Sequence, residues 1–423
     1  MPDLFKSKHF RDEKVKRNFF LNVFDGSVYS FAMSFVSLQT VLPIFIKKIS
    51  GSDIAVGLIP VIWLVGFNFP QIFVSNHVRR LGYKKPWMLK TALVQRIPWL
   101  VLAFLSYFLV DSLDNSTALI IIFIGLAFAA FGGSINLPGW FDLISKITPV
   151  QLRGRLFAFR SVLGAAMGIF GGWVVSLILD SISYPENYSL LFLIAFIVMM
   201  LSYTFLTLLK EEHPNHPQSD FTYKEFLKRL STILKEEKNF RNFIIADAMM
   251  MLALMSNAFL AVNAMEKFNL TDAYAGYFTI IMMLSMTFGS LYFGYLADKK
   301  GHKLNLIWSS IFTLIACLAA LISPIVEIYF ISFAASALTI TLTQVSRLTI
   351  IAEICREDDR PTYISLTNLM TAPFVLSGLF GGWLASAFGY DAVFIIAGIF
   401  AALAFIWLNM KVAEPRKIEF VNN

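Results

Sequence analysis

Long apolar stretches separated by short polar ones dominate this sequence. A run of about 20 or more mostly apolar residues is long enough to cross the hydrocarbon core of a bilayer as a helix. Backbone polar groups find no water there, so such runs predict helices. Twelve runs can be placed, near residues 19–46, 54–76, 86–110, 117–145, 154–180, 187–209, 239–265, 272–297, 304–323, 326–352, 361–388 and 390–411.

The composition excludes an ordinary soluble protein. Hydrophobic residues make up 57% of the chain and charged residues only 15%, whereas soluble domains carry about 25% charged residues. Cys317 lies inside an apolar run and Cys355 at the edge of one, so the two cysteines indicate neither a disulfide nor a metal cluster. We therefore expect an all-α membrane protein without a metal or cofactor.

The distribution of basic residues predicts the orientation. Alternate loops hold clusters of basic residues, namely Arg79, Arg80, Lys84 and Lys85 in one and Lys299, Lys300 and Lys303 in another. The loops on the other side hold only Lys47, Lys48 and Lys267. The positive-inside rule then places both termini in the cytoplasm, as expected for a multi-pass protein of the cell membrane whose polar first eighteen residues precede a retained span. The net charge of +7 suits anionic headgroups of the lipid bilayer and does not indicate nucleic acid.

An internal repeat divides the chain into two halves. Phe-Gly-Gly-Trp at 170–173 in the fifth run recurs at 380–383 in the eleventh, and Asp25 in the first run corresponds to Asp247 in the seventh. Lys146 and Glu353 also stand at matching positions, just after the fourth and tenth runs. This predicts two pseudo-symmetric six-helix bundles. The expected parts are a cytoplasmic tail at 1–18, bundles at 19–209 and 239–411, a linker with an amphipathic helix at 210–238, and a tail at 412–423.

The turn at 294–303, between the eighth and ninth runs, reads GYLADKKGHK. It resembles the cytoplasmic signature G-x-x-x-D-[RK]-x-G-[RK]-[RK] of the major facilitator superfamily. That resemblance implies twelve transmembrane helices in two related halves, a permease that works by alternating access, and substrate bound near the midplane. The acid of the signature can sit against the positive N-terminal end of another helix. The matching residues are Gly294, Asp298, Lys299, Gly301 and Lys303.

Two departures prevent assignment to a subfamily. In the first half the corresponding loop has Ser75 and Arg79 where the signature has glycine and aspartate. In the fifth run, proton-driven drug exporters resemble one another in a motif that contains a proline, and Ile169 stands at that position here. The resemblance therefore implies transport without naming the substrate, the direction or the coupling ion.

Charges inside the runs form a second group of candidates. Asp25, Asp247, Arg160 and Arg347 lie about five to eight residues from the predicted cytoplasmic ends, which is roughly 8–12 Å deep at about 1.5 Å per residue. One interpretation is a layer of gate ion pairs that form and part during transport, or a carboxyl that carries the coupled proton. The other is static pairing or snorkelling to headgroups. The gate or proton-coupling candidates are Asp25, Asp247, Arg160 and Asp142.

Substrate candidates follow from the resemblance, which implies that the first, fourth, seventh and tenth spans line the cavity. An arginine there would favour a carboxylate or phosphate. Helix-packing hydrogen bonds are the alternative for each residue, and Arg96 in the third span is interpreted as structural. The polar side chains on the four spans include Asn22 and Thr343, and the substrate-binding candidates are Gln39, Asn136, Trp140, Asn257, Asn263, Gln344 and Arg347.

The sequence thus predicts a secondary transporter of a small solute, coupled to protons and functional as a monomer. No phosphate-binding loop for ATP and no hydrolase motif is present, so an enzyme is not expected. Three alternatives stay open: an exporter of amphiphilic compounds, an importer of a sugar or organic anion, and a membrane receptor or scaffold that transports nothing.

Overall fold

The computed structural model describes residues 12–108, 110, 112–211, 233–355 and 360–417. Every regular element in these residues is a helix, which confirms the predicted all-α class. The chain forms two compact units. Unit 1 lies within Met1–Gly51, Ile62–Asp220 and Thr271–Ile280, and unit 2 lies within Ser52–Val61, Phe221–Leu270 and Ile281–Asn423. The predicted amphipathic helix of the linker falls mostly outside the described residues.

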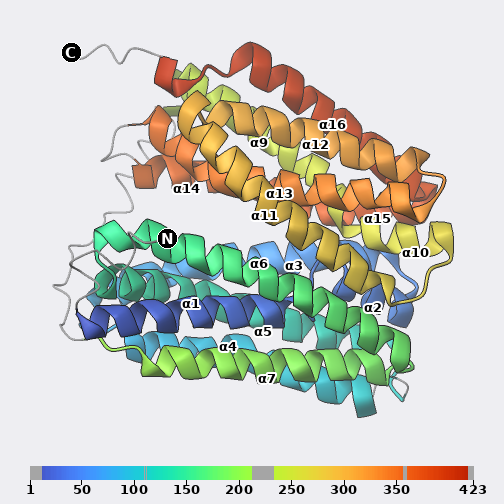
Figure 1. The fold of residues 1–423 in the computed structure, drawn as a ribbon. Coiled ribbons are helices and arrows are strands. Elements are labelled where there is room, and N and C mark those ends of the chain that lie inside the picture. Colours follow the sequence, from blue (N-terminus) through green and yellow to red (C-terminus); the bar gives the residue numbers. More distant parts are fainter. Residues whose placement is uncertain (1–11, 109, 111, 212–232, 356–359, 418–423) are drawn as a thin grey trace. The chain divides into compact units, whose positions relative to one another are not determined.

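In unit 1, helix α1 packs against α6 and α7, and α4 packs against α5 and α7 (Figure 1). Carboxylates cap two of these helices: Asp12 accepts from the Lys14 amide and Asp114 from the Thr117 amide, as N-cap residues do. The helices are α1 (Glu13–Ser34), α2 (Val41–Ser50), α3 (Asp53–Arg80), α4 (Lys85–Phe108), α5 (Asn115–Ile147), α6 (Val150–Ser181) and α7 (Glu186–Leu208).

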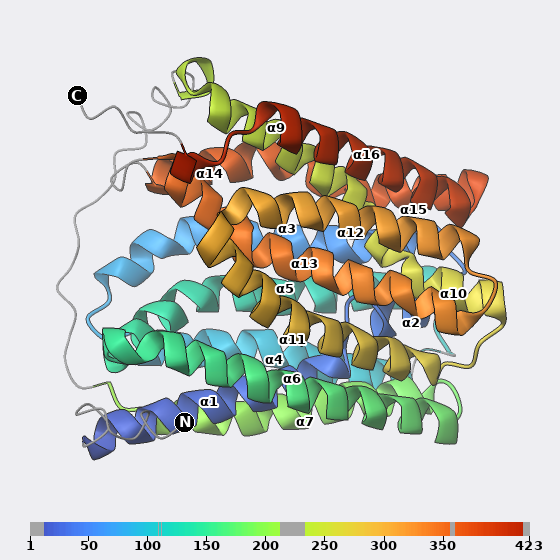
Figure 2. The same ribbon diagram turned by 45° about the horizontal axis from the view of Figure 1, so that its top comes forward.

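In unit 2, α16 packs against α9 and α12, and α12 packs against α13 (Figure 2). Three short 3₁₀ helices, labelled η, accompany the α-helices. The elements are α9 (Lys238–Ala253), η2 (Leu254–Ala258), α10 (Leu260–Phe268), α11 (Tyr274–Lys300), α12 (His302–Ile322), α13 (Val326–Ile354), α14 (Arg360–Thr371), η4 (Ala372–Leu376), α15 (Ser377–Phe388), α16 (Tyr390–Lys411) and η5 (Pro415–Lys417).

Each unit includes the beginning of a helix that continues in the other. The first turns of α11 belong to unit 1, where Asp272 accepts hydrogen bonds from Lys48 at 2.5 Å and from Tyr188 at 3.2 Å. The first turns of α3 belong to unit 2, where Tyr390 donates to Asp53 at 2.6 Å. The compact units therefore differ from a simple cut of the chain at the linker.

Eleven helical stretches of the described residues are long and apolar enough to span a membrane. The first expected run, 19–46, is not among them: α1 ends at Ser34, α2 begins only at Val41, and α1, although 22 residues long, is too polar by itself. Pro43 explains the break: it has no N–H to donate back to residue 39, and its ring clashes with a preceding helical turn. Helix α1 also starts earlier than predicted, after the Asp12 cap.

Two further predicted spans are interrupted by 3₁₀ turns. In the seventh, η2 separates α9 from α10, and the Ser256 hydroxyl donates to the Ala253 carbonyl in competition with the helical pattern. In the eleventh, η4 separates α14 from α15 and contains Pro373, which cannot continue an α-helix. The first interruption directly follows α9 and the second directly follows α14. Both of these helices contribute side chains to a polar site described below.

The buried core repeats between the halves. In unit 1, Phe19, Met88, Leu143, Leu156 and Leu206 join α1, α4, α5, α6 and α7. The unit 2 cluster joins α9, α12, α13, α14 and α16 through Phe240, Leu306, Ile350, Leu366 and Leu408. Corresponding helices thus supply the core in both halves, as two related six-helix bundles require.

The turn between α11 and α12 is a single residue, Gly301. Its φ of 92° and ψ of 160° lie in a region that is essentially restricted to glycine. A Cβ there would lie 2.3 Å from the Glu414 carboxyl, whereas a Cβ on Gly294 would meet nothing within 4 Å. Of the two signature glycines, the second is the one that the fold requires.

We predict that Gly301→Ala lowers the free energy of unfolding by about 1–3 kcal/mol through backbone strain. Gly294→Ala is the matched control and should be neutral or slightly stabilising, because Gly294 is helical and has open space. Thermal unfolding of both variants in detergent measures the difference. Equal melting temperatures would show that the backbone at Gly301 relaxes freely.

Candidate functional site

Asp25 and Arg160 meet inside unit 1. Arg160 on α6 donates from Nη1 to Asp25 Oδ2 at 3.1 Å, and also to the Asn22 carbonyl at 2.6 Å and to Asn22 Oδ1 at 2.5 Å. The Asp25 side chain is only 5% exposed and that of Arg160 17%. Gly26 leaves room for the guanidinium, since a Cβ at Gly26 would lie 2.3 Å from Arg160 Cζ.

Arg96 joins the same group through a hydroxyl. Ser202 donates to Asp25 Oδ1 at 2.7 Å, and Arg96 Nη2 donates to Ser202 at 3.3 Å. The rest of the guanidinium binds the carbonyls of Met199 and Ala92 at 3.0 Å and lies 5.7 Å from the centres of the Tyr29 and Tyr203 rings. Arg96 is 3% exposed and surrounded by these partners, which could not be identified from the sequence of its own span.

Asp247 and Arg347 form the corresponding ion pair of unit 2, between α9 and α13. Arg347 Nε donates to Asp247 Oδ2 at 2.8 Å, and Nη2 lies 2.8 Å from the same oxygen. Nη1 donates to Asn368 at 3.3 Å and Nη2 to Thr371 at 3.2 Å. All three guanidinium nitrogens are therefore engaged, and the pair is held from α14 as well.

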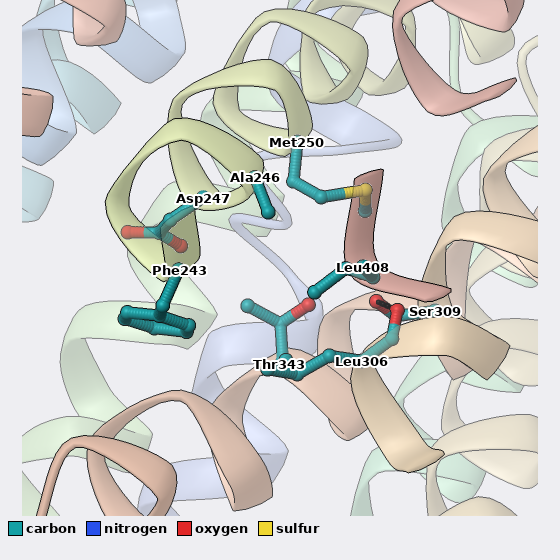
Figure 3. Close-up of a pocket in the computed structure, with 8 residues that line it drawn as sticks. All are labelled: Phe243, Ala246, Asp247, Met250, Leu306, Ser309, Thr343 and Leu408. Atoms are coloured by element: carbon teal, nitrogen blue, oxygen red, sulfur yellow. Dashed lines mark hydrogen bonds between the residues drawn. The ribbon is translucent and has the colours of Figure 1, made fainter. Parts of the chain in front are cut away.

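A small cavity lies beside this pair (Figure 3). Its volume of about 10 Å³ is close to the least that holds one water molecule. Asp247 supplies a carboxylate to the lining, and the buried Thr343 hydroxyl hydrogen-bonds no protein atom that the structure describes. Phe243, Met250 and Leu408 make much of the remaining wall apolar. A space of this size, with a carboxylate and a hydroxyl on an otherwise largely apolar wall, can admit one water molecule.

Three of the six other substrate candidates hydrogen-bond neighbouring helices. Asn136 donates to the Met88 carbonyl at 2.6 Å, Asn263 donates to Tyr329 at 2.9 Å, and Asn257 accepts from Ser336 at 2.9 Å. Gln39 is half-buried and Gln344 exposed, and Trp140 lies 5.0 Å from the Arg160 guanidinium. Asp142 is half-exposed and 3.5 Å from Lys84. The structure thus brings Trp140 to the Asp25 group and holds the three asparagines in helix packing.

The signature turn contacts the segment after α16. Lys303 donates its amide to Glu414 at 3.2 Å, and Arg416 donates to the Asp298 carbonyl at 2.8 Å and to Glu353 at 2.6 Å. The Asp298 side chain is exposed, and the Lys299 ammonium lies 4.5 Å from the Tyr295 ring. In this structure Glu414, rather than Asp298, provides the carboxylate at the start of α12.

Glu211 occupies the equivalent place in unit 1, and sequence reasoning missed it. Its carboxylate is 2% exposed and accepts from the amides of Lys84 and Lys85 and from Lys146 Nζ, each at about 2.9 Å. Anions are favoured at such a helix start. The available signal was positional: Glu211 and Glu414 each follow the last helix of their half within a few residues.

Comparison with known proteins gives one family. The model of the Major Facilitator Superfamily matches residues 18–263 and again 243–422. No curated protein matches the sequence. Similar solved structures include a bacterial homologue of the human lysosomal transporter Spinster, in an inward-facing and unoccupied conformation (14% identity, 96% of this chain and 98% of that chain, TM-score 0.67). Others are the nucleoside transporter NupG (13%, 94% and 100%, 0.71) and a D-xylose–proton symporter (14%, 96% and 99%, 0.69). At these identities the likeness shows the fold.

We predict that Asp247→Leu lowers the free energy of unfolding by about 3–5 kcal/mol, because it leaves Arg347 buried without its counter-charge. The double variant Asp247→Leu with Arg347→Leu should recover most of that loss, since no unpaired charge remains. Chemical unfolding in detergent measures both. A double variant no more stable than the single one would indicate that the pair itself, rather than the orphaned cation, carries the stability.

Glu414 gives a prediction for pH. Burial raises the pKa of its carboxyl, so the folded chain holds this proton more tightly than the unfolded chain. The free energy of unfolding should therefore decrease as pH rises from the ordinary glutamate pKa through the raised one. Glu414→Gln should flatten that slope in melting curves, whereas Glu327→Gln, at an exposed site of the same unit, should leave it unchanged.

Proposed function

Because this chain belongs to the Major Facilitator Superfamily, we propose that it moves a small solute across the cell membrane by alternating access, coupled to protons. The family and the solved relatives indicate a transporter and not an enzyme. The solved relatives are transporters of different solutes, nucleosides in one case and D-xylose in another, so none of them identifies the substrate of this chain. Both termini in the cytoplasm and a monomeric carrier are further parts of this proposal, the first supported by the basic residues of the loops.

One observation carries the coupling to protons: the ion pair of Asp247 and Arg347 beside a cavity that suits one water. Inserting a charged carboxylate into a span costs roughly 2.5–3.5 kcal/mol on insertion scales. Its presence there therefore favours the interpretation that Asp247 has a functional role. Protonation of Asp247 would remove the charge that holds Arg347. It would free the guanidinium while Asn368 and Thr371 still limit its movement.

Asp25 and Arg160 are proposed to take part in the conformational cycle in unit 1. Each ion pair lies within one unit, so each can respond to a proton or a solute locally. Asp142 is a weaker candidate for this role because its side chain is 49% exposed and its distance to Lys84 is 3.5 Å. Solvent screens a carboxylate as exposed as that of Asp142 and weakens its interaction with Lys84.

The test is accumulation driven by a pH gradient. Proteoliposomes containing the purified chain are placed in an acidic medium with a pool of sugars, nucleosides, organic acids and peptides, and the trapped solutes are identified by mass spectrometry. The wild type should accumulate one class of solute above its external concentration. Asp247→Asn should abolish accumulation and keep exchange of labelled for unlabelled solute, because exchange needs no net proton movement.

Asp180→Asn is the matched control for the loss of one acid, since Asp180 is exposed near the end of α6. It should accumulate solute as the wild type does. If Asp247→Asn accumulates solute normally, Asp247 is not the coupling group. If no gradient of protons changes the uptake of any solute, the coupling proposal fails as a whole.

A further inference from the structure

We propose that Arg160, with Asn22 and Trp140, forms an anion subsite in unit 1 that binds the carboxylate or phosphate group of a small organic solute. This inference deepens the proposed function and rests on it for its biological meaning. It assigns the recognition of an anion to an arginine on α6, whereas the sequence favoured Arg347 on α13.

The first argument is charge balance. The group linked through Ser202 contains two guanidinium cations, those of Arg96 and Arg160, and one carboxylate, that of Asp25. The equivalent group of unit 2 pairs one guanidinium with one carboxylate. An excess cation among apolar helices is costly, so an anionic solute would stabilise the group of unit 1 by neutralising it.

The second argument is the supply of hydrogen-bond donors. Among the described residues, every hydrogen bond of Arg160 uses Nη1, whereas Arg347 engages all three of its nitrogens. Nε and Nη2 of Arg160 lie against Gly26, 2.5 and 2.6 Å from where a Cβ would be. The side chain keeps 17% exposure, and neither Nε nor Nη2 is among the fully buried polar atoms that lack a partner. A guanidinium with two open donors suits the two oxygens of a carboxylate.

Asn22 supplies an independent observation. The residue is 0% exposed, and its Nδ2 hydrogen-bonds no protein atom in the part of the chain that is described. Its Oδ1 accepts from Arg160 at 2.5 Å, which fixes the amide so that Nδ2 cannot exchange places with Oδ1. A buried amide donor without an acceptor is unfavourable, and a bound anion beside Arg160 would satisfy it.

Trp140 indicates that the anion is organic. The indole ring centre lies 5.0 Å from Arg160 Cζ, and Phe157 packs against the same indole at 6.3 Å. This aromatic wall gives apolar contact for the body of a solute whose charged end meets the guanidinium. A bare inorganic ion would leave that surface unused.

Binding to the purified chain in detergent tests the inference without any proton gradient. The probes are benzoate and phenyl phosphate, with neutral benzamide and the lipophilic cation tetraphenylphosphonium as counter-probes, and the readouts are the melting temperature and Trp fluorescence. A ligand that binds only the folded chain raises its melting temperature. Either anion should bind and both counter-probes should not. The stronger of the two anions identifies the group as a carboxylate or a phosphate.

Three variants locate the site. Arg160→Gln should weaken anion binding at least about tenfold, because it removes charge-assisted donors. Gly26→Ala should weaken it as well while keeping the charge, since a Cβ would displace the flexible end of Arg160. This second variant serves if Arg160→Gln does not fold. Arg155→Gln is the matched control, because Arg155 is exposed on the same helix and the substitution removes the same charge.

Several outcomes would overturn the inference. They are binding of the counter-probes alone, no binding of either anion, or binding that survives both Arg160→Gln and Gly26→Ala. A stabilising effect of phosphatidylglycerol that depends on Arg160, with none from the soluble anions, would identify a lipid headgroup site instead. Anion binding that depends on Arg160 in a chain that transports nothing would sustain this site and remove only the proposed function.

Discussion

Charge inside an apolar layer must be neutralised, and the described parts of both bundles are arranged around that constraint. An isolated arginine or aspartate at the centre of a span is unfavourable by roughly 2.5–3.5 kcal/mol on insertion scales. Asp25 and Asp247 each draw an arginine from another helix of their own unit. These contacts fix how α1 meets α6 and how α9 meets α13, and the apolar cores close around them.

The two halves reach this neutralisation by different routes. Trp140 stands six residues before Lys146, and Arg347 stands six residues before Glu353, so the two occupy equivalent places in the repeat. Unit 2 therefore takes its cation from the fourth helix of its half, whereas unit 1 has an indole there and takes Arg160 from the fifth. Arg96 then adds a second cation to unit 1 alone. The exchange changes which helix supplies the paired arginine, and Arg96 is the source of the extra positive charge in the group of unit 1.

The sequence predicted the helical class, eleven of the twelve expected spans and the family, because each depends on local composition and on short motifs. It located both acids and both arginines of the two ion pairs, but not which side chains each would contact. The rotation of α6 about its axis decides whether Arg160 meets Asp25, and apolar periodicity is weak where helices are hydrophobic all round. Glu211 was missed because its three donors come from residues more than sixty positions away in the chain, so no local pattern reveals them. Pro43, by contrast, was a local signal of the break before α2. The substrate and gate assignments remain predictions.

The carboxylates that follow α7 and α16 have a consequence for the history of the two halves. In unit 1 the partner at the end of α5 is a cation, Lys146, facing Glu211. In unit 2 the residue at the equivalent place is an anion, Glu353, which binds Arg416 two positions beyond Glu414. Both halves have an ion pair at this place, but the acidic and basic residues have exchanged positions. A first half given the glutamate of the second would set two carboxylates against each other, so the halves are no longer interchangeable parts, and a chain assembled from two copies of either would have to redesign this junction.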